Sequence, residues 1–499
     1  MKVYLDCQEN LIRACQDMVR VFFSDIYFTA APEGADFILC FQTVRDEENI
    51  IVEGSLDTSQ SGQQGKDKLT IRAVDKQYPD ELSHNAYKRV AKLAVMGLLE
   101  RYTAKSAGPW GILTGIRPTK IAHRKLDLDW TGEQLAQFLQ TSFALRRDKS
   151  LLLSQVANLQ RNFLHPQTQA GKFVSIYIGI PFCPTRCVYC SFPAYSLEKY
   201  QAWVEPFVAA LQKEIQSVGQ CVKELGLEVE TIYIGGGTPT SLPVNKLGQI
   251  LQEVEQWLKT PSTREYTVEA GRPDTLNLKM LSLLQAQGVT RLSINPQSMN
   301  PQTLKTIGRA HSPEEVIKAM ELARGLGFGN INMDLIIGLP GEGRSEISQT
   351  LQQIKALAPE NITVHTLAIK RASTLQEQRG NFDLAGAEVV AEMLELTYSA
   401  AREAGLRPYY LYRQKHMLGH LENVGFARPG FEGIYNIQMI EERQTIIGLG
   451  GGSGSKWVNP ADWSLEATYN PKDPKNYFER VEELIGKKVE RLAYLCNSD

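Results

Sequence analysis

The residues of this chain best suited to chemistry are three cysteines that lie within one short segment. Three residues separate Cys183 from Cys187, and two separate Cys187 from Cys190. Thiolates are soft ligands that favour zinc or iron–sulfur clusters. A structural zinc site needs four ligands, and no fourth Cys or His follows within twenty residues. Three thiolates on a [4Fe–4S] cluster would leave one iron open to bind a small molecule and pass it an electron. The alternative is three buried structural thiols or a degenerate zinc knuckle.

The elements around these cysteines alternate apolar strands with amphipathic helices. Six β-then-α repeats predict parallel strands joined by right-handed crossovers. Because six repeats fall short of a closed eight-unit barrel, we expect an α/β fold with a partial (β/α)6 barrel and its chemistry at the carboxyl ends of the strands. The cysteine segment directly follows the first strand. The predicted strands are Val174–Ile180, Val229–Ile234, Tyr266–Glu269, Arg291–Asn295, Ile331–Ile337 and Ile362–Ala368.

The barrel is expected to be one of four segments. Residues 1–105 indicate an N-terminal α/β domain and residues 106–165 a helical connector. Residues 166–405 form the barrel, and residues 406–499 a C-terminal α+β extension that caps it or meets the substrate. The glycine-rich run Gly448–Ser455 is interpreted as a turn that closes the barrel mouth, because a proline and no helix follow it.

Composition excludes several other classes of protein. The 499 residues are 43% hydrophobic, enough for a large core, and suggest about three structural units. The 54 basic and 56 acidic residues give a net charge of −2, so a nucleic-acid partner is not expected. Eight cysteines are too few for a secreted disulfide scaffold. Neither a signal peptide nor an apolar run of about 18 residues is found, which predicts a cytoplasmic protein without a membrane span.

The cysteine spacing, with the aromatic Tyr189 before the last thiol, resembles the signature of the radical S-adenosylmethionine (radical SAM) superfamily. The stretch Tyr177–Cys183 resembles the oxygen-independent coproporphyrinogen III oxidase (coproporphyrinogen dehydrogenase) family. The loop Trp110–Lys120 is similar to the HemZ-type branch of that family. Four further blocks carry the same resemblance: Gly235–Thr240, Arg291–Gln297, Ile307–Arg309 and Asp334–Pro340.

The resemblance implies a role for particular residues. Cys183, Cys187 and Cys190 would bind a [4Fe–4S] cluster, and Tyr177 would reach S-adenosylmethionine (SAM) or the substrate. SAM itself would be held by Tyr189, Gly236, Gly237, Thr238, Glu269, Gln297, Arg309 and Asp334.

The types of these residues leave some alternatives open. A glycine block lets the backbone approach a ligand closely, or it is a plain turn between strand and helix. Glu269 at a strand end suits a ribose hydroxyl or an ammonium group, or else a salt bridge to Arg272. Asp334 lies between apolar neighbours and needs a partner, either a ligand or a cation.

The implied reaction is the conversion of two propionates of coproporphyrinogen III to vinyl groups in haem biosynthesis, without oxygen. A low-potential electron donor such as flavodoxin or ferredoxin would supply the electron. The alternatives are a haem- or porphyrin-binding carrier on the same scaffold and a radical SAM enzyme with another substrate.

Overall fold

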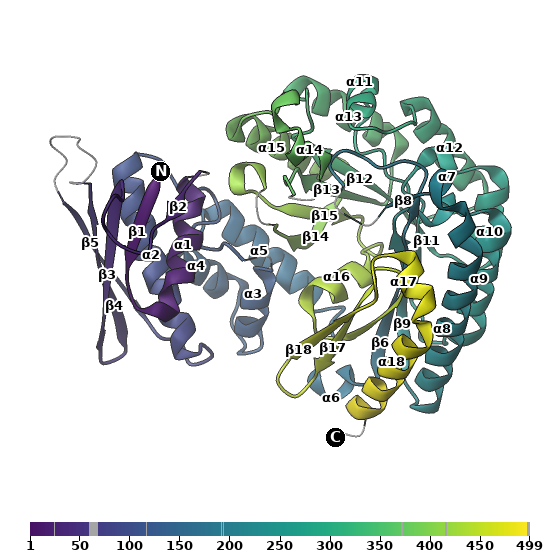
Figure 1. Cartoon of the computed structure of the whole chain (residues 1–499), viewed down its shortest axis with the longest axis horizontal. Coiled ribbons are helices and arrows are strands. Elements are labelled where there is room, and N and C mark those ends of the chain that lie inside the picture. Colours follow the sequence, from purple (N-terminus) through teal and green to yellow (C-terminus); the bar gives the residue numbers. More distant parts are fainter. Residues whose placement is uncertain are drawn as a thin grey trace. The chain divides into compact units, whose positions relative to one another are not determined.

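The computed structural model describes residues 1–23, 25–58, 68–115, 117–190, 192, 194–370, 373–414 and 417–496. The chain forms two compact units (Figure 1). The first contains Met1–Asn158 with Arg413–Lys415, and the second contains Leu159–Tyr412 with His416–Asp499. The finer division into four segments stays a prediction.

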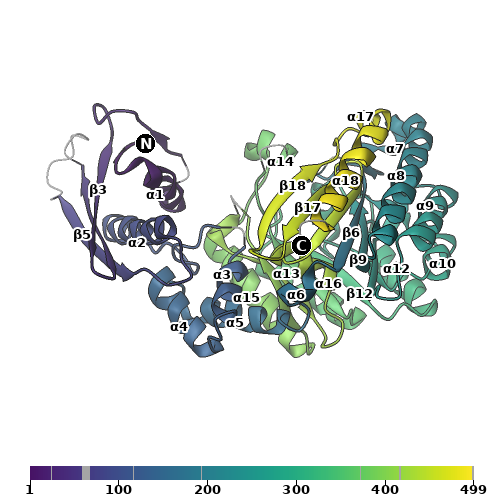
Figure 2. The same cartoon turned by 90° about the horizontal axis from the view of Figure 1, so that it is seen from below.

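The N-terminal unit is built on a five-stranded sheet of order β2-β1-β3-β4-β5. Its elements are β1 Lys2–Asp6, α1 Glu9–Phe22, β2 Tyr27–Phe28, β3 Phe37–Asp46, β4 Asn49–Asp57, β5 Leu69–Lys76 and α2 Ser83–Thr103. β1 pairs in parallel with β2 and β3, whereas β3, β4 and β5 are antiparallel. α1 and α2 pack against each other, and α2 lies on β4 and β5 (Figure 2). The predicted α/β character of this region is confirmed.

Three further helices complete the N-terminal unit before the chain enters the second unit. They are α3 Thr119–Leu126, α4 Gly132–Phe143 and α5 Arg147–Gln160. Thr131 begins α4 with a capping box, in which its hydroxyl accepts from the Gln134 amide and the Gln134 side chain accepts from the Thr131 amide. Tyr78, Trp130 and Phe138 pack edge to face beside these helices. This region is therefore helical.

The second unit contains the partial barrel. Its six parallel strands are β6 Phe173–Ile180, β9 Glu228–Gly236, β10 Glu265–Glu269, β11 Arg291–Ser293, β12 Ile331–Ile337 and β13 Asn361–Thr366. The long helices between and after them are α8 Val204–Glu224, α9 Val244–Trp257, α10 Leu278–Ala286, α12 Pro313–Gly325, α13 Arg344–Leu357 and α15 Ala387–Glu403. These helices lie outside the strands (Figure 1). The predicted (β/α)6 barrel is confirmed.

The C-terminal extension adds strands at both ends of this sheet, giving the order β14-β15-β13-β12-β11-β10-β9-β6-β16-β17-β18. The added elements are β14 Arg407–Tyr412, β15 Asn423–Ala427, α16 Ile434–Glu441, β16 Thr445–Gly450, β17 Gly454–Asn459, β18 Ser464–Tyr469, α17 Pro474–Glu479 and α18 Val481–Cys496. β16 pairs in parallel with β6, while β14, β15, β17 and β18 join through antiparallel pairs.

The interpretation of Gly448–Ser455 as a turn is therefore wrong for most of that run. Gly448 and Gly450 belong to a buried strand, and the turn is confined to the residues between β16 and β17. A Cβ atom on Gly448 would lie 2.6 Å from the Gly454 carbonyl, so the two strands approach too closely for a side chain. Glycines here serve close strand packing rather than a turn alone.

The strands of the barrel alternate apolar and polar residues, because successive side chains point to opposite faces. The polar side chains bond to one another across the strands. Thr231 Oγ1 donates to Ser175 Oγ at 2.8 Å, and Asn332 Nδ2 donates to Ser293 Oγ at 2.8 Å. Thr363 Oγ1 donates to Asn332 Oδ1 at 2.9 Å. Each of these partners satisfies the other, so these polar groups can lie inside the barrel without a large desolvation cost.

Helices α17 and α18 attach the C-terminal extension to the barrel, and α18 lies against α8 (Figure 2). Glu214 on α8 is fully buried and forms the centre of this attachment. Its carboxylate accepts from the Gly450 amide at 2.7 Å, from Tyr477 Oη at 2.7 Å and from Lys488 Nζ at 2.8 Å. Within the described residues, no helix is long and apolar enough to cross a membrane.

Candidate functional site

The cysteine segment runs across the carboxyl ends of the barrel strands. Its first part, β7 (Phe182–Cys183), pairs with β8 (Tyr195–Ser196). Further along, the Val188 amide donates to the Ile307 carbonyl at 3.1 Å, and the Val188 carbonyl accepts from the Leu375 amide at 3.0 Å. These backbone bonds hold the segment between two other loops of the same barrel end.

The three thiols form a group suited to a cluster. All three are half-buried. Burial raises the pKa of Cys183 to about 11 and also raises the pKa of Cys190, and the neighbouring thiols raise both further. In the described part of the chain, no three His, Cys, Asp or Glu side chains converge on a single metal ion. A [4Fe–4S] cluster contains four irons and is bound by thiolates, so its ligands need not meet at one point. The donor set therefore fits a cluster.

The glycine block at the end of β9 lies directly against the cysteine segment. The Gly237 amide donates to the Ile180 carbonyl at 2.8 Å. A Cβ atom on Gly237 would lie 2.4 Å from the Phe182 carbonyl oxygen and 3.0 Å from Cys183 Sγ. Gly236 has a φ of 111°, a conformation that side chains disfavour. The block is therefore more than a plain turn, because it brings β9 up to the first cysteine.

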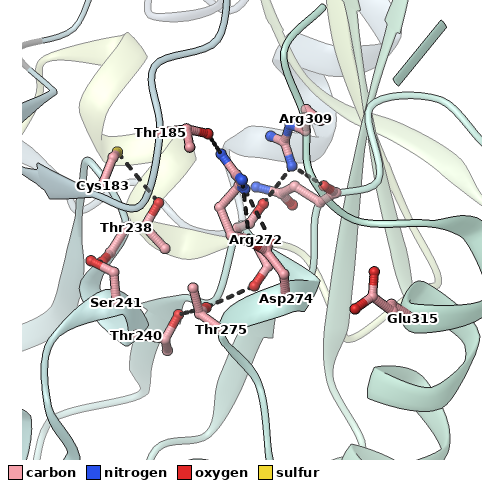
Figure 3. A network of polar contacts seen from close by, with 12 residues as sticks. Cys183, Thr185, Thr238, Thr240, Ser241, Arg272, Asp274, Thr275, Arg309 and Glu315 are labelled. Carbon is pink, nitrogen blue, oxygen red and sulfur yellow. Dashed lines mark hydrogen bonds and ion pairs between the residues drawn. The ribbon is translucent and has the colours of Figure 1, made fainter. Parts of the chain in front are cut away.

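Thr238 continues this contact, since its hydroxyl lies 3.5 Å from Cys183 Sγ (Figure 3). Its amide donates to the Phe182 carbonyl at 2.7 Å. The Thr238 side chain is buried. Thr238 therefore helps to hold the Cys183 thiol in place.

Glu269 at the end of β10 faces the glycine block. Its carboxylate accepts from Tyr233 Oη at 2.6 Å and from the Gly236 amide at 3.3 Å. Burial raises the pKa of Glu269 to about 7; the Tyr233 bond opposes this shift, whereas the negative charge of Asp334 adds to it. A carboxylate with such a pKa gains from a ligand that brings a hydrogen-bond donor or a positive charge.

The alternative salt bridge from Glu269 to Arg272 is not formed. Arg272 is buried and instead binds the Asp274 carboxylate through Nε at 3.0 Å and Nη2 at 3.2 Å. Its Nη1 donates to Thr185 Oγ1, in the cysteine segment, at 3.0 Å (Figure 3). This arginine thus fixes the loop between Cys183 and Cys187.

Asp334 on β12 is held by polar neighbours. Burial alone would raise its pKa, but contacts from His365 and Asn332 hold the pKa of Asp334 below its ordinary value. Asn332 Nδ2 donates to Asp334 Oδ1 at 2.7 Å, and His365 Nε2 lies 3.7 Å from Oδ2. His365 Nδ1 in turn lies 3.0 Å from Tyr412 Oη. Asp334 therefore has the partner that its apolar neighbours in the sequence require, and His365 on β13 is part of it.

Gln297 and Arg309 each have a buried polar atom without a partner in the described residues, Gln297 Oε1 and Arg309 Nε. Gln297 adopts a φ of 66°, and its amide donates to the Asp334 carbonyl at 2.9 Å. Arg309 Nη1 donates to the carbonyls of Gly271 and Asn295, both at 2.8 Å, and Nη2 lies 3.4 Å from Tyr189 Oη. Unpartnered buried polar atoms such as these two suit a polar ligand.

Tyr177 lies in a group of three stacked tyrosines. Its ring centroid is 6.2 Å from that of Tyr233 and 6.1 Å from that of Tyr435, and Tyr233 and Tyr435 are 4.5 Å apart. Burial raises the pKa of Tyr177 above its ordinary value. These rings form an aromatic wall inside the barrel, next to Glu269.

The predicted site residues therefore come together at one end of the barrel. Tyr233, His365 and the Arg272–Asp274 pair also belong to this end but are not among the predicted residues. Tyr233 could have been found, because it lies two residues before Gly235 on the same face of β9. Its register partner on β6 is Tyr177.

A cysteine triplet, a glycine block and strand-end carboxylates around an open parallel barrel define a radical SAM protein. The family model described as "Radical SAM superfamily" matches residues 177–354. The chain is 40% identical over 492 residues to the oxygen-independent coproporphyrinogen-III oxidase-like protein HemZ of Bacillus subtilis (strain 168), covering 98% of this chain and 96% of the relative. The chain therefore belongs to the HemZ family of oxygen-independent coproporphyrinogen-III oxidase-like proteins. Radical SAM proteins use a [4Fe–4S] cluster and SAM, and these are its cofactors.

Two other similarities cover only part of the chain. The heme chaperone HemW of Bacillus subtilis (strain 168) is 32% identical over 293 residues, covering 57% of this chain and 73% of the relative. The solved structure of coproporphyrinogen III oxidase (HemN) from Escherichia coli matches with a TM-score of 0.51 and 23% identity, covering 66% of this chain and 73% of that chain. The structural match supports the fold alone.

Proposed function

We propose that this radical SAM enzyme acts on a porphyrinogen and converts coproporphyrinogen III to protoporphyrinogen IX without oxygen. Each of two propionates becomes a vinyl group by losing CO2, a hydrogen atom that the 5′-deoxyadenosyl radical would take, and one electron that would pass to an external electron acceptor. The observation that carries the proposal is the similarity to HemZ over nearly the whole chain. The proposal also includes a cytoplasmic location and a low-potential electron donor such as flavodoxin or ferredoxin.

In this proposal the cysteine segment holds the cluster through Cys183, Cys187 and Cys190. Bound together, the cluster and SAM supply a 5′-deoxyadenosyl radical after one-electron cleavage of SAM. The protein contributes binding, orientation and the exclusion of side reactions. Thr185, held by Arg272, keeps the first half of the segment in place.

The residues proposed to hold SAM lie on several barrel strands and on the loops that follow them. Glu269, with its raised pKa, accepts a hydrogen bond from a ribose hydroxyl or the ammonium group. Gln297 Oε1 and Arg309 Nε offer an acceptor and a donor that no described residue uses. Gly236, Gly237 and Thr238 place the backbone of β9 beside the first thiol. Asp334 and Tyr189 complete the set, Asp334 as an acceptor and Tyr189 as a flat ring for the adenine.

Tyr177 is proposed to orient the reacting groups, together with Tyr233 and Tyr435. Stacked rings have few rotatable bonds and present a flat apolar face with polar edges. Such a wall restricts where a ligand can lie inside the barrel.

A second function is supported by the similarity to HemW, a heme chaperone. In that case the chain would bind haem or a porphyrin and release it to another protein. A radical SAM reaction on a different substrate is the third possibility. The three functions differ in their products, so one assay separates them.

The assay is anaerobic incubation of the reconstituted protein with SAM, a reductant and coproporphyrinogen III. Formation of protoporphyrinogen IX with two CO2 for each molecule supports the proposal. Cleavage of SAM without a porphyrin product eliminates this reaction. Stoichiometric haem binding with a Soret band and no turnover supports the carrier instead.

A pair of variants tests the cluster within the same assay. Cys187→Ala removes one proposed ligand, and we expect iron and sulfide content, SAM cleavage and product all to be lost. Cys40→Ala removes a half-buried thiol of the N-terminal unit and serves as the matched control. Full iron and sulfide content in Cys187→Ala would show that the cluster is not bound there.

A further inference from the structure

The N-terminal unit contains a cavity of about 560 Å³ that lies outside the barrel site. Residues of α1, α2, α3 and α4 line it, together with the loop Ile112–Gly115. All of these residues belong to one compact unit. Small-molecule sites in proteins typically have volumes of about 300–1,000 Å³, so this cavity is large enough for a metabolite.

The lining of this cavity is strongly basic. Six basic and three acidic side chains line it, an excess of three positive charges in a chain whose net charge is −2. Four of the lining residues, Asn85, Lys88, Arg89 and Lys92, lie on α2 at positions that share one helical face. The polar face of this helix is thus turned to the cavity.

Two of the cations are already neutralised by carboxylates of the same unit. Arg89 is buried and pairs with Asp75, and also with Glu81 through Nη2 at 2.8 Å. Lys125 is buried, pairs with Asp80 and lies 4.3 Å from the centroid of the Tyr78 ring. These two cations stabilise the fold and need no ligand.

Three other cations of the lining, unlike Arg89 and Lys125, are not neutralised by any carboxylate that the structure describes. Arg13 comes from α1, Lys88 from α2 and Arg124 from α3, and all three line the cavity. In the described ranges of the chain, none of the three forms an ion pair with a carboxylate. Arg13 and Arg124 are exposed and Lys88 is half-buried, so an anion entering from solvent can reach them.

The rest of the lining is apolar and favours an organic ligand. Ile112, Leu113 and Phe143 are buried residues that line the cavity from the loop and from α4. Arginine binds phosphate and carboxylate groups in bidentate fashion, and lysine adds a point charge. We propose that this cavity binds a small organic anion that carries two or more phosphate or carboxylate groups, held by Arg13, Lys88 and Arg124.

The test is calorimetric titration of the full-length reconstituted protein with ADP, citrate and inorganic pyrophosphate. We expect ADP or citrate to bind, and ADP to bind more tightly than pyrophosphate if the ligand is an organic phosphate. The double variant Arg13→Gln/Arg124→Gln should raise the Kd about tenfold or more. Lys88→Gln should raise it less, because one point charge is lost. Arg101→Gln, an exposed arginine on α2 that bonds to the Thr70 carbonyl, is the control and should leave the Kd unchanged.

Salt dependence provides a second measurement that needs no variant. Raising NaCl from about 50 to about 300 mM should weaken binding, because screening reduces the attraction of exposed cations for an anion. The proposal is overturned if none of the three probes binds, if the double variant keeps the wild-type Kd, or if Kd does not respond to salt. None of these outcomes depends on activity toward porphyrinogens.

Discussion

The barrel interior and the N-terminal cavity hold buried polar groups in opposite ways. Inside the barrel, hydroxyl and amide groups bond to one another, and carboxylates gather at the strand ends with tyrosine, glycine and histidine partners. In the lining of the N-terminal cavity cations predominate, and carboxylates bind two of them, Arg89 and Lys125. One region thus brings carboxylates and tyrosine rings together, whereas the lining of the other carries an excess of cations.

The difference shows how stabilising polar groups can be distinguished from binding groups within one chain. A buried group whose hydrogen bonds are complete supports the fold, and its removal leaves partners unsatisfied. Groups with unused bonding capacity, such as Gln297 Oε1 or the cation of Lys88, contribute little to the fold. The free-energy cost of removing such groups from water is offset only when a ligand binds to them. Substitutions in the two classes should therefore have different effects on stability.

The largest expected effect is on the stability of the N-terminal unit. Arg89→Leu leaves Asp75 and Glu81 without their cation, although both carboxylates keep some contact with solvent. Breaking a buried ion pair typically costs about 3–5 kcal/mol, and we expect about 3 kcal/mol here. Urea unfolding, followed by the fluorescence of Trp110 and Trp130 in this unit, measures the loss.

The neighbouring residue supplies the matched comparison. Lys88→Gln removes a cation of the same helix that has no carboxylate partner, and surface changes of this kind stay within about 0.5 kcal/mol. Equal losses of stability in Arg89→Leu and Lys88→Gln would contradict the distinction between cations that pair with a carboxylate and cations that do not.

The next effect concerns the barrel site. A methyl group at residue 237 would lie 2.4 Å from the backbone oxygen of Phe182, which cannot move aside as a flexible side chain can. Gly237→Ala should therefore displace the cysteine segment. Because a shift of about 1 Å can cost a factor of about 10², we expect a similar loss in the rate of SAM cleavage.

The control for this variant is Gly329→Ala, where an added Cβ meets no atom within 4 Å. It should cleave SAM at the wild-type rate. Iron content measured in both variants separates loss of the cluster from misplacement of SAM. Wild-type iron content and activity in Gly237→Ala would contradict the close contact between β9 and the first cysteine.

The sequence predicts most of the fold because the information is local. The six barrel strands are apolar runs that alternate with helical periodicity, and each appears in the structure within a few residues of its predicted bounds. β16 escapes prediction because its glycines suggest a turn locally. Those glycines are required by a distant strand, since a Cβ atom on Gly450 would lie 2.3 Å from the Gly179 carbonyl.

The site is predictable to a similar extent. Cysteine spacing and the glycine block are local signals, so both could be placed from the sequence. The partners of Arg272 and Arg309 could not, because they depend on which loops meet at the barrel end. Arg272 donates to Thr185, 87 residues away in the sequence, and Arg309 donates to the carbonyl of Gly271, 38 residues away. Long-range pairing of this kind has no signature in a single sequence.

The smallest expected effect is the pH dependence contributed by Glu269. Its pKa in the folded protein is about 7, above the ordinary value of 4.5, because burial disfavours the charged carboxylate. The folded state therefore binds a proton that the unfolded state releases between about pH 4.5 and 7. Stability from this group is fully present below pH 4.5 and is lost as the pH rises through 7.

Glu269→Gln removes this titration but keeps a similar shape. One pKa unit corresponds to about 1.4 kcal/mol, and because Glu269 retains some solvent exposure we expect a difference of about 1–2 kcal/mol. Both proteins are prepared without the cluster, and their free energies of unfolding are measured by urea unfolding at two pH values. Glu269→Gln should be more stable than the wild type by that amount at pH 8 and equally stable at pH 4.5. A wild type and variant with parallel pH profiles would mean that Glu269 is not held in a desolvated, acidic environment. The barrel end would then lack the desolvated carboxylate that distinguishes it from the basic cavity of the N-terminal unit.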